Sequence, residues 1–317
     1  MAKLDFGQDK KIKVTQDGVY LLDEDIKKQI NRKRLSASLI NAINQSPGEW
    51  LLSSFIEPLV SDKEPIYFAR GHWFHSVMEE HFQNPDHSPE TLKEDFIRAT
   101  KKQPKFAKEP KKDEDLNQYM DLMKDKESKA WMKGCLKGYI DLAKKNGFYD
   151  KKVAQLFSKG QQTNGVEFFA INSLPDIENS CLGFIDCLFE TPDGLRIIDW
   201  KTGKFHKGDA GYELQQTFYT ILLEKEGFKV GSAALVFPVS NVIEEINVHD
   251  PDVRDRVMNE VRMADKTLSK CKKENFYPFK KHKWNSWQSF LTGVGTARKP
   301  DINEELFYHY ADLSELI

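Results

Sequence analysis

The feature that most constrains the fold is a change in hydrophobic period near Val166. Before this residue, apolar side chains recur at helical spacing, whereas after it they alternate as they do in β-strands. The later part of the chain is predicted to contain strands at 166–171, 181–190 and 195–201, a helix at 212–225, and strands at 232–237 and 242–248. The core order is therefore a leading helix, a long insertion, three strands, a helix and a strand, which predicts an α/β fold.

A turn signal, Thr191-Pro192-Asp193-Gly194, lies between the second and third of these strands. Two pairings of the strands are compatible with it. A four-residue loop pairs Glu190 with Leu195, whereas a two-residue loop pairs Pro192 with Leu195. The sequence alone leaves both registers open.

Three chemically active side chains share one face of this hairpin in either register. With the four-residue loop Asp186 lies opposite Asp199, and with the two-residue loop it lies opposite Lys201. Cross-strand neighbours have Cβ atoms roughly 5 Å apart, and carboxylates that close repel each other unless a cation or a proton lies between them. Oxygen ligands beside a lysine suit Mg²⁺ or Mn²⁺. The pattern predicts a metal site for phosphodiester hydrolysis, with Lys201 stabilising charge on the phosphate or orienting the attacking water.

Ordinary strand charges on a solvated face are the alternative explanation, because D-x-K triplets occur often by chance. The neighbours of the two acids favour the metal site, since placing carboxylates among apolar side chains costs free energy unless they are paired. The apolar residues predicted on the same face are Leu182, Phe184, Leu188, Leu195 and Ile197.

Helical patterns precede the strands. Ser36 is placed to cap a helix that stops before Pro47, and Ser46-Pro47-Gly48-Glu49 has the form of a capping box with proline at the first helical position. The segment 70–82 is the clearest amphipathic helix. His75 and Glu79 lie four residues apart on its flank, and Glu79 is interpreted as a surface acid.

The rest of the chain divides by composition. The predicted segments are a polar N-terminal stretch at 1–34, N-terminal helices at 35–84, a charged helical insertion at 85–160, the core at 161–250, and a C-terminal helix with a lysine- and aromatic-rich tail at 251–317. Lysines that track phosphates, beside aromatic rings on which bases stack, suit single-stranded nucleic acid. Solvated lysines next to ordinary core aromatics explain the same pattern in 266–283 equally well.

Composition excludes some classes of protein. In 317 residues, 47 Lys and Arg stand against 49 Asp and Glu, which gives a net charge of −2. This excludes a uniformly cationic nucleic-acid coat protein but permits one local basic groove, and the lysines of 101–113 and 266–283 are candidates to line it. No apolar run approaches the ~18 residues of a membrane span, and no secretory signal is evident. Four cysteines without C-x-x-C spacing suggest free thiols in the cytoplasm.

Four motifs occur in the order of a known family. Gly183-Phe184-Ile185-Asp186 resembles its G-x-x-D strand, and Asp199-Trp200-Lys201-Thr202-Gly203 resembles its D-x-K-T-G strand. Gln215 to Tyr219 matches Q-x-x-x-Y, and Gly71 to His75 matches G-x-x-x-H. The chain thus resembles the RecB-like nucleases of the PD-(D/E)XK superfamily, which implies a restriction-endonuclease-like αβββαβ core with a central mixed sheet flanked by helices.

The resemblance also implies roles for individual residues. It makes His75, Asp186 and Asp199 ligands of one or two Mg²⁺ or Mn²⁺ ions, with the backbone carbonyl of Trp200 as a further ligand. It makes Lys201 the catalytic lysine.

Three further residues are assigned supporting roles. Gln215 and Tyr219 are expected to contact the active-site strand or DNA, and Glu167 is a candidate extra acid near the metals.

One departure from the family concerns iron–sulfur clusters, which many RecB-like nucleases hold with four cysteines. Here Ser46 stands at the proline-preceding position, and the C-terminal region contains only Cys271. A four-thiolate cluster is therefore not expected. The chain resembles the cluster-free members, such as the mitochondrial genome maintenance exonuclease and phage exonucleases.

The combined expectation is a metal-dependent DNA exonuclease that prefers single strands or ends. A structure-specific endonuclease for flaps or junctions, and a nuclease-fold DNA-binding module that has lost its chemistry, are the alternatives. The family further suggests a role in DNA recombination or repair in a bacterial or phage-infected cell, with a single-strand-binding or annealing protein as a partner and no membrane association.

Overall fold

The computed structural model describes residues 10–61, 66–101, 118–158, 161–280, 286–293 and 299–316. The chain forms two compact units. The terminal unit contains residues 1–63, 173–181 and 256–317, and the central unit contains 64–172 and 182–255. The units differ from the serial segments predicted above, because the N-terminal stretch and the C-terminal region share one unit although they lie at opposite ends of the sequence.

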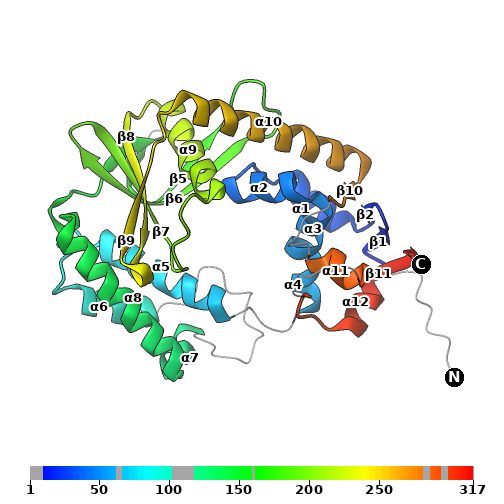
Figure 1. Ribbon diagram of the computed structural model, residues 1–317, viewed down its shortest axis with the longest axis horizontal. Helices are drawn as coiled ribbons and strands as arrows, with labels where there is room; N and C mark the ends of the chain where they lie inside the picture. The colour runs from blue at the N-terminus through cyan, green and yellow to red at the C-terminus, as the bar shows by residue number, and fades with distance from the viewer. Residues whose placement is uncertain are drawn as a thin grey trace. The chain divides into compact units, whose positions relative to one another are not determined.

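The central unit is built on a five-stranded sheet of order β5-β6-β7-β8-β9 (Figure 1). Strand β7 pairs antiparallel with β6 and parallel with β8, and β8 pairs antiparallel with β9, so the sheet is mixed. The strands are β5 (Val166–Asn172), β6 (Cys181–Thr191), β7 (Gly194–Trp200), β8 (Val230–Phe237) and β9 (Val242–Ile246). The predicted α/β class with a mixed sheet is confirmed.

The β6–β7 hairpin adopts the register in which Glu190 pairs with Leu195, so the alternative pairing of Pro192 with Leu195 is wrong. The loop is nevertheless shorter than the four residues expected with this register, because Thr191 also pairs with Gly194. Gly194 makes the tight loop possible, since its φ is 125° and a Cβ there would lie 2.5 Å from the Lys229 carbonyl oxygen.

Helices of the central unit form a cluster in which the first contacts β5 of the sheet and the others pack against the first. They are α5 (Ile66–Gln83), α6 (Leu92–Lys101), α7 (Gln118–Lys124) and α8 (Lys126–Lys145), while α9 (Ala210–Lys225) packs against β5 and β8. Trp73, Phe74 and Val77 of α5 are fully buried in a core that includes Trp200 of β7. The Trp200 ring stacks on Phe82, with centroids 5.5 Å apart and planes 9° apart. Burying each such side chain contributes roughly 1.5–3 kcal/mol, which fixes α5 against the sheet.

The predicted helical insertion at 85–160 ends in a strand, which is a correction. Strand β3 (Gln155–Ser158) pairs with β4 (Gln161–Asn164). Four residues give too short a pattern to show period two, and Phe157 is 71% exposed, so the segment lacks the buried apolar alternation of a core strand.

The terminal unit has its own sheet, of order β10-β2-β1-β11. Its strands are β1 (Ile12–Thr15), β2 (Gly18–Leu21), β10 (Phe276–Pro278) and β11 (Ala311–Glu315). The interpretation of 1–34 as a polar stretch did not include these strands. The residues buried in this sheet include Ile12, Val14, Val19 and Leu21. Their strands have only four residues each and lie among polar residues, so the apolar alternation is too short to be recognised in the sequence.

The helices of the terminal unit include the two predicted around Pro47. They are α1 (Glu24–Asn31), α2 (Ala37–Gln45), α3 (Pro47–Leu51), α4 (Glu57–Val60), α11 (Ser286–Thr292), α12 (Glu304–Tyr310) and most of α10 (Pro251–Glu274), whose first residues belong to the central unit. A π-helical turn (Leu52–Ile56) joins α3 to α4. Ser36 caps α2 as predicted, since its side chain accepts a hydrogen bond from the Leu39 amide.

The predicted capping box is wrong, although Pro47 does begin α3. The Ser46 hydroxyl accepts from the Lys280 amide at 3.2 Å, and the Glu49 carboxylate accepts from the Trp287 and Gln288 amides at 3.1 and 2.6 Å. Both side chains bind segments distant in the sequence, which local spacing does not reveal. Burial raises the pKa of Glu49, although these amides oppose the shift.

The described aromatic residues of the C-terminal region do not support the predicted stacking surface. Tyr277 is 1% exposed and Trp287 is 0% exposed, so neither ring is accessible to a base. Lys272 and Lys280 donate hydrogen bonds from their ammonium groups to Asn179 and to the Asn44 carbonyl. Lys281, Lys283 and Trp284, and the lysines of 102–113, lie outside the described residues. The core explanation therefore holds for these two rings, whereas Phe276, Phe279 and Phe290 are half-buried.

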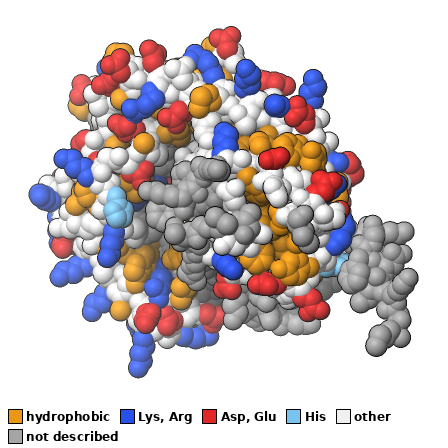
Figure 2. Space-filling model, turned by 45° about the vertical axis from the view of Figure 1, so that its right-hand side comes forward, with side chains coloured by type: hydrophobic (Ala, Val, Ile, Leu, Met, Phe, Trp, Pro, Cys, Tyr) orange, Lys and Arg blue, Asp and Glu red, His pale blue; other side chains and the backbone are white. Residues whose placement is uncertain are grey.

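Two findings bear on the surface. Across the described ranges, no helix combines the length and the apolar character that crossing a membrane requires. On the face that Figure 2 shows, Lys and Arg side chains are interspersed with Asp and Glu side chains, in keeping with the net charge of −2.

Candidate active site

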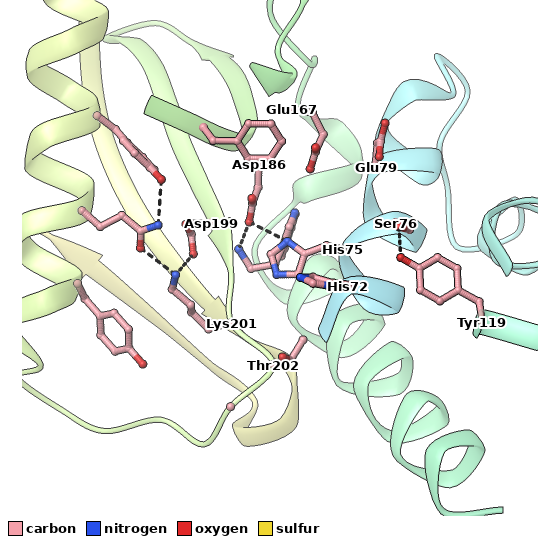
Figure 3. A pocket seen from close by; sticks show the side chains of 16 residues that line it. His72, His75, Ser76, Glu79, Tyr119, Glu167, Asp186, Asp199, Lys201 and Thr202 are labelled. Carbon is pink, nitrogen blue, oxygen red and sulfur yellow. Dashed lines mark hydrogen bonds and ion pairs between the residues drawn. The ribbon is translucent and has the colours of Figure 1, made fainter. Parts of the chain in front are cut away.

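A pocket of about 440 Å³ lies within the central unit, between α5, the ends of β6 and β7, and the first turns of α9 (Figure 3). This volume is within the range of small-molecule sites and is large enough for one nucleotide. Each predicted site residue lines the pocket: His75, Glu167, Asp186, Asp199, Trp200, Lys201, Gln215 and Tyr219. The fold therefore brings together residues separated by up to 144 positions in the sequence.

Asp186 lies near the middle of β6 and is 8% exposed. Its Oδ2 atom accepts a hydrogen bond from the Trp200 amide at 2.8 Å and lies 3.4 Å from His75 Nδ1. Burial alone would raise the pKa of Asp186, but His75 and the Trp200 amide outweigh it, so the pKa is lowered. Asp186 is therefore ionised at neutral pH.

Asp199 lies one residue before the end of β7 and is 3% exposed. Burial raises its pKa, the neighbouring Asp186 carboxylate adds to the rise, and Lys201 opposes it. The pKa values of the two acids are thus shifted in opposite directions, although both carboxylates lie in one site. A divalent cation bound between them would favour the ionised form of both, since it would add positive charge to that of Lys201 and His75.

Lys201 directly follows β7 and joins three residues in one chain of contacts. Its ammonium lies 2.7 Å from Asp199 Oδ2 and donates to Gln215 Oε1 at 2.8 Å. The Gln215 amide nitrogen in turn donates to the Tyr219 hydroxyl at 3.1 Å. Burial would lower the pKa of Lys201, but Asp199 and Asp186 together raise it. Lys201 is therefore a cation held in place from two sides.

The helical spacing of Gln215 and Tyr219 explains this arrangement, because residues four apart lie on one face of α9. Sequence reasoning placed both near the active-site strand or DNA, and the structure places the Gln215 side chain against Lys201.

His75 projects from α5 toward Asp186 (Figure 3). Its side chain keeps a third of its surface exposed, at 33%. Burial alone would lower its pKa, but Asp186, and to a smaller extent Asp199, raise it. The neutral imidazole is a metal ligand and the charged form is an ion-pair partner of Asp186, so this residue links α5 to the two acids.

The donor set fits a hard divalent cation. Among the residues that the structure describes, no three His, Cys, Asp or Glu side chains are grouped closely enough to form a complete metal site. Mg²⁺ needs no such group, because it retains waters and is usually held by one or two carboxylates together with substrate phosphates. Asp186 and Asp199 would provide those carboxylates, and His75 would be a nitrogen donor beside them. The role of the Trp200 carbonyl stays a prediction.

Eight further residues line the pocket without having been assigned to it from the sequence: His72, Ser76, Glu79, Tyr119, Phe184, Thr202, Gly203 and Tyr212. Glu79, which was interpreted as a surface acid rather than a ligand, is a half-buried residue of this lining. The available signal was the helical spacing of His72, Ser76 and Glu79 around His75. Tyr119, whose hydroxyl is 3.0 Å from that of Ser76, had no local signal.

Glu167 lies on β5 and lines the same pocket. Its φ is 52°, in the left-handed region that residues other than glycine rarely adopt. Such conformations cost of order 1–3 kcal/mol and concentrate at functional sites. The backbone of Glu167 is thus held in a strained conformation at the pocket, although its part in the chemistry stays a prediction.

The comparison with protein families decides the classification. The family model of the PD-(D/E)XK nuclease superfamily matches residues 34–297. The chain belongs to this superfamily. The match includes every residue that lines the pocket. A search of curated proteins found no match. Membership supports a nuclease and suggests a divalent metal requirement, which agrees with the donor set at Asp186 and Asp199.

Proposed function

We propose that this chain is a Mg²⁺- or Mn²⁺-dependent DNA exonuclease that acts on single strands or free ends. The observation that carries the proposal is the meeting of Asp186, Asp199 and Lys201 in one pocket beside His75. Two buried acids next to a fixed cation suit a reaction in which a metal-bound phosphate is attacked by water.

A divalent ion bound at this site would bind phosphate oxygens and lower the pKa of a water molecule. Asp186 and Asp199 would hold it, with His75 as a further donor. Lys201 remains protonated because its pKa is raised, so its ammonium can donate a hydrogen bond to a phosphate oxygen. Donors fixed in this way stabilise charge that develops in the transition state.

Gln215 and Tyr219 act on the reaction through Lys201. Gln215 accepts a hydrogen bond from the Lys201 ammonium, and its own amide is held by the Tyr219 hydroxyl. The lysine therefore meets the substrate in one orientation, which reduces the free energy needed to order it in the transition state.

The test is digestion of an end-labelled linear single strand with Mg²⁺ or Mn²⁺, using EDTA as the metal-free control. Wild type should release short products, and Asp199→Ala or Lys201→Ala should lower the rate by at least about 10²-fold. Phe157→Ala, which alters an exposed ring outside the pocket, is the matched control. Unchanged rates for Asp199→Ala and Lys201→Ala would contradict the proposed site.

A circular single strand of the same sequence tests the requirement for an end. An exonuclease leaves the circle intact while it degrades the linear strand. Cleavage of both at similar rates would contradict the exonuclease proposal and would favour an endonuclease built on the same site.

A further inference from the structure

An exposed pair of aromatic side chains lies at the beginning of α5. Tyr67 is 61% exposed and Phe68 is 52% exposed, and their ring centroids are 4.5 Å apart with planes 39° apart. Later in the same helix Trp73 and Phe74 are fully buried. Single exposed apolar residues are common on protein surfaces, whereas adjacent exposed rings near a functional pocket point to a binding role.

Phe68 lies on the pocket side of α5. Counting from it, His72, His75 and Glu79 follow at four, seven and eleven residues, which is the spacing of one helix face. These three residues line the pocket. At 1.5 Å per residue, Phe68 lies about 10 Å along the helix axis from His75. Phe68 therefore lies on the helix face that carries these pocket residues, one turn before His72.

Exposed cations lie on the loop that follows two residues of the pocket lining, Thr202 and Gly203. The loop that follows β7 begins beside α5, since a Cβ on Gly71 would lie 3.5 Å from Thr202 Oγ1. Lys204 and Lys207 of this loop are exposed. Lysines that meet phosphates and rings that meet bases are the two elements of a site for single-stranded nucleic acid.

We propose, on the basis of the nuclease function above, that Phe68 stacks on an unpaired base of the substrate strand, with Tyr67 supporting the ring. The base would belong to a nucleotide near the scissile phosphate, because the ring lies about two helical turns from His75. An unpaired base can turn its face to a protein ring, whereas a base stacked in a duplex cannot. The aromatic pair would thus favour single strands or frayed ends.

A double-mutant cycle between the ring and the base tests this proposal. Binding is measured by fluorescence anisotropy with labelled 15-residue deoxyoligonucleotides, one intact and the others with a single abasic position. The protein carries Lys201→Ala and the buffer contains EDTA, so the strand stays intact. Phe68→Ala should weaken binding of the intact strand about 5- to 150-fold, the range for one stacked base. Phe68→Trp should retain binding.

The cycle separates stacking from a general loss of structure. One abasic position should weaken binding to the protein with Phe68 but have no further effect on Phe68→Ala, because ring and base act together. Phe157→Ala should bind like the parent, since Phe157 is an exposed ring on β3, a strand that contributes no residue to the pocket.

The outcomes are distinguishable. If wild type digests the strand but Phe68→Ala binds like Phe157→Ala, or its loss is coupled to no base, the stacking proposal fails and the nuclease stands. If the protein binds with the predicted coupling between Phe68 and a base but wild type never cleaves the strand, the nuclease proposal fails and the stacking proposal stands. If the protein neither binds nor cleaves single strands, both fail.

Discussion

Replacing Gln215 by Leu tests whether this residue positions the catalytic lysine or contacts DNA. The amide accepts a charge-assisted hydrogen bond from Lys201 at 2.8 Å. Bonds to charged groups contribute about 1.5–3 kcal/mol. Lys201 keeps 23% of its side-chain surface exposed and still contacts Asp199 in the variant, so the loss should fall toward the lower end of that range. About 1–2 kcal/mol of transition-state free energy corresponds to a 5- to 30-fold lower kcat.

The assay is steady-state digestion of the labelled single strand at saturating metal, with kcat and KM determined separately. A positioning role lowers kcat and leaves KM nearly unchanged, because the lysine donates mainly to charge that develops in the transition state. Tyr219→Phe should give a smaller loss, about 2- to 5-fold, since it removes only the hydroxyl that holds the Gln215 amide.

Gln45→Leu is the matched control, because it makes the same chemical change at an exposed amide whose partner is Asn41. An unchanged kcat in Gln215→Leu would refute the positioning role. An increase in KM alone would also refute it and would identify Gln215 as a DNA contact instead.

Three further predictions concern stability and are measured by urea or thermal unfolding. Asp95→Ala should cost about 1–3 kcal/mol, because Asp95 is fully buried and its removal leaves the ring nitrogen of buried His81, now 2.6 Å from the carboxylate, without that partner; a loss below 1 kcal/mol would contradict this. Burial lowers the pKa of His81 despite Asp95, so the unfolded chain takes up a proton first and stability should fall as the pH drops through about 6.5; a His81→Asn variant with the same pH slope would disprove that origin. Gly194→Ala should cost about 1–3 kcal/mol because of its φ of 125° and the close Lys229 carbonyl. Gly134→Ala, in a helix with open space around it, should stabilise by roughly 0.5–1 kcal/mol, and equal effects of the two changes would contradict the argument.

Local sequence patterns predicted the elements of the central unit that carry the candidate site. Alternating apolar residues predicted β6 and β7, and the stripe of Phe74, Val77 and Met78 predicted α5. The short motifs placed Asp186, Asp199, Lys201 and His75 on these elements. Periodicity and spacing succeed here because each element is long enough for its own side chains to define a buried face.

The terminal unit depended on contacts that local patterns do not contain. Strand β10 has three residues, and its partner β2 lies more than 250 positions earlier in the sequence. The same reason explains the failed capping box, because Ser46 and Glu49 bind amides of residues 280–288. Short strands acquire stability from their pairing partners rather than from their own composition.

The sequence by itself determined the α/β class, the order of the core elements and the residues of the candidate site, since motif spacing and hydrophobic period are properties of neighbouring residues. Only the tertiary structure decided the hairpin register, the pairing of the chain ends in one sheet, and the contact of Lys201 with both Asp199 and Gln215. It also decided which rings are accessible, burying Tyr277 and Trp287 while leaving Tyr67 and Phe68 exposed. Exposure depends on what the rest of the chain packs against each ring, and that packing is set by residues far away in the sequence.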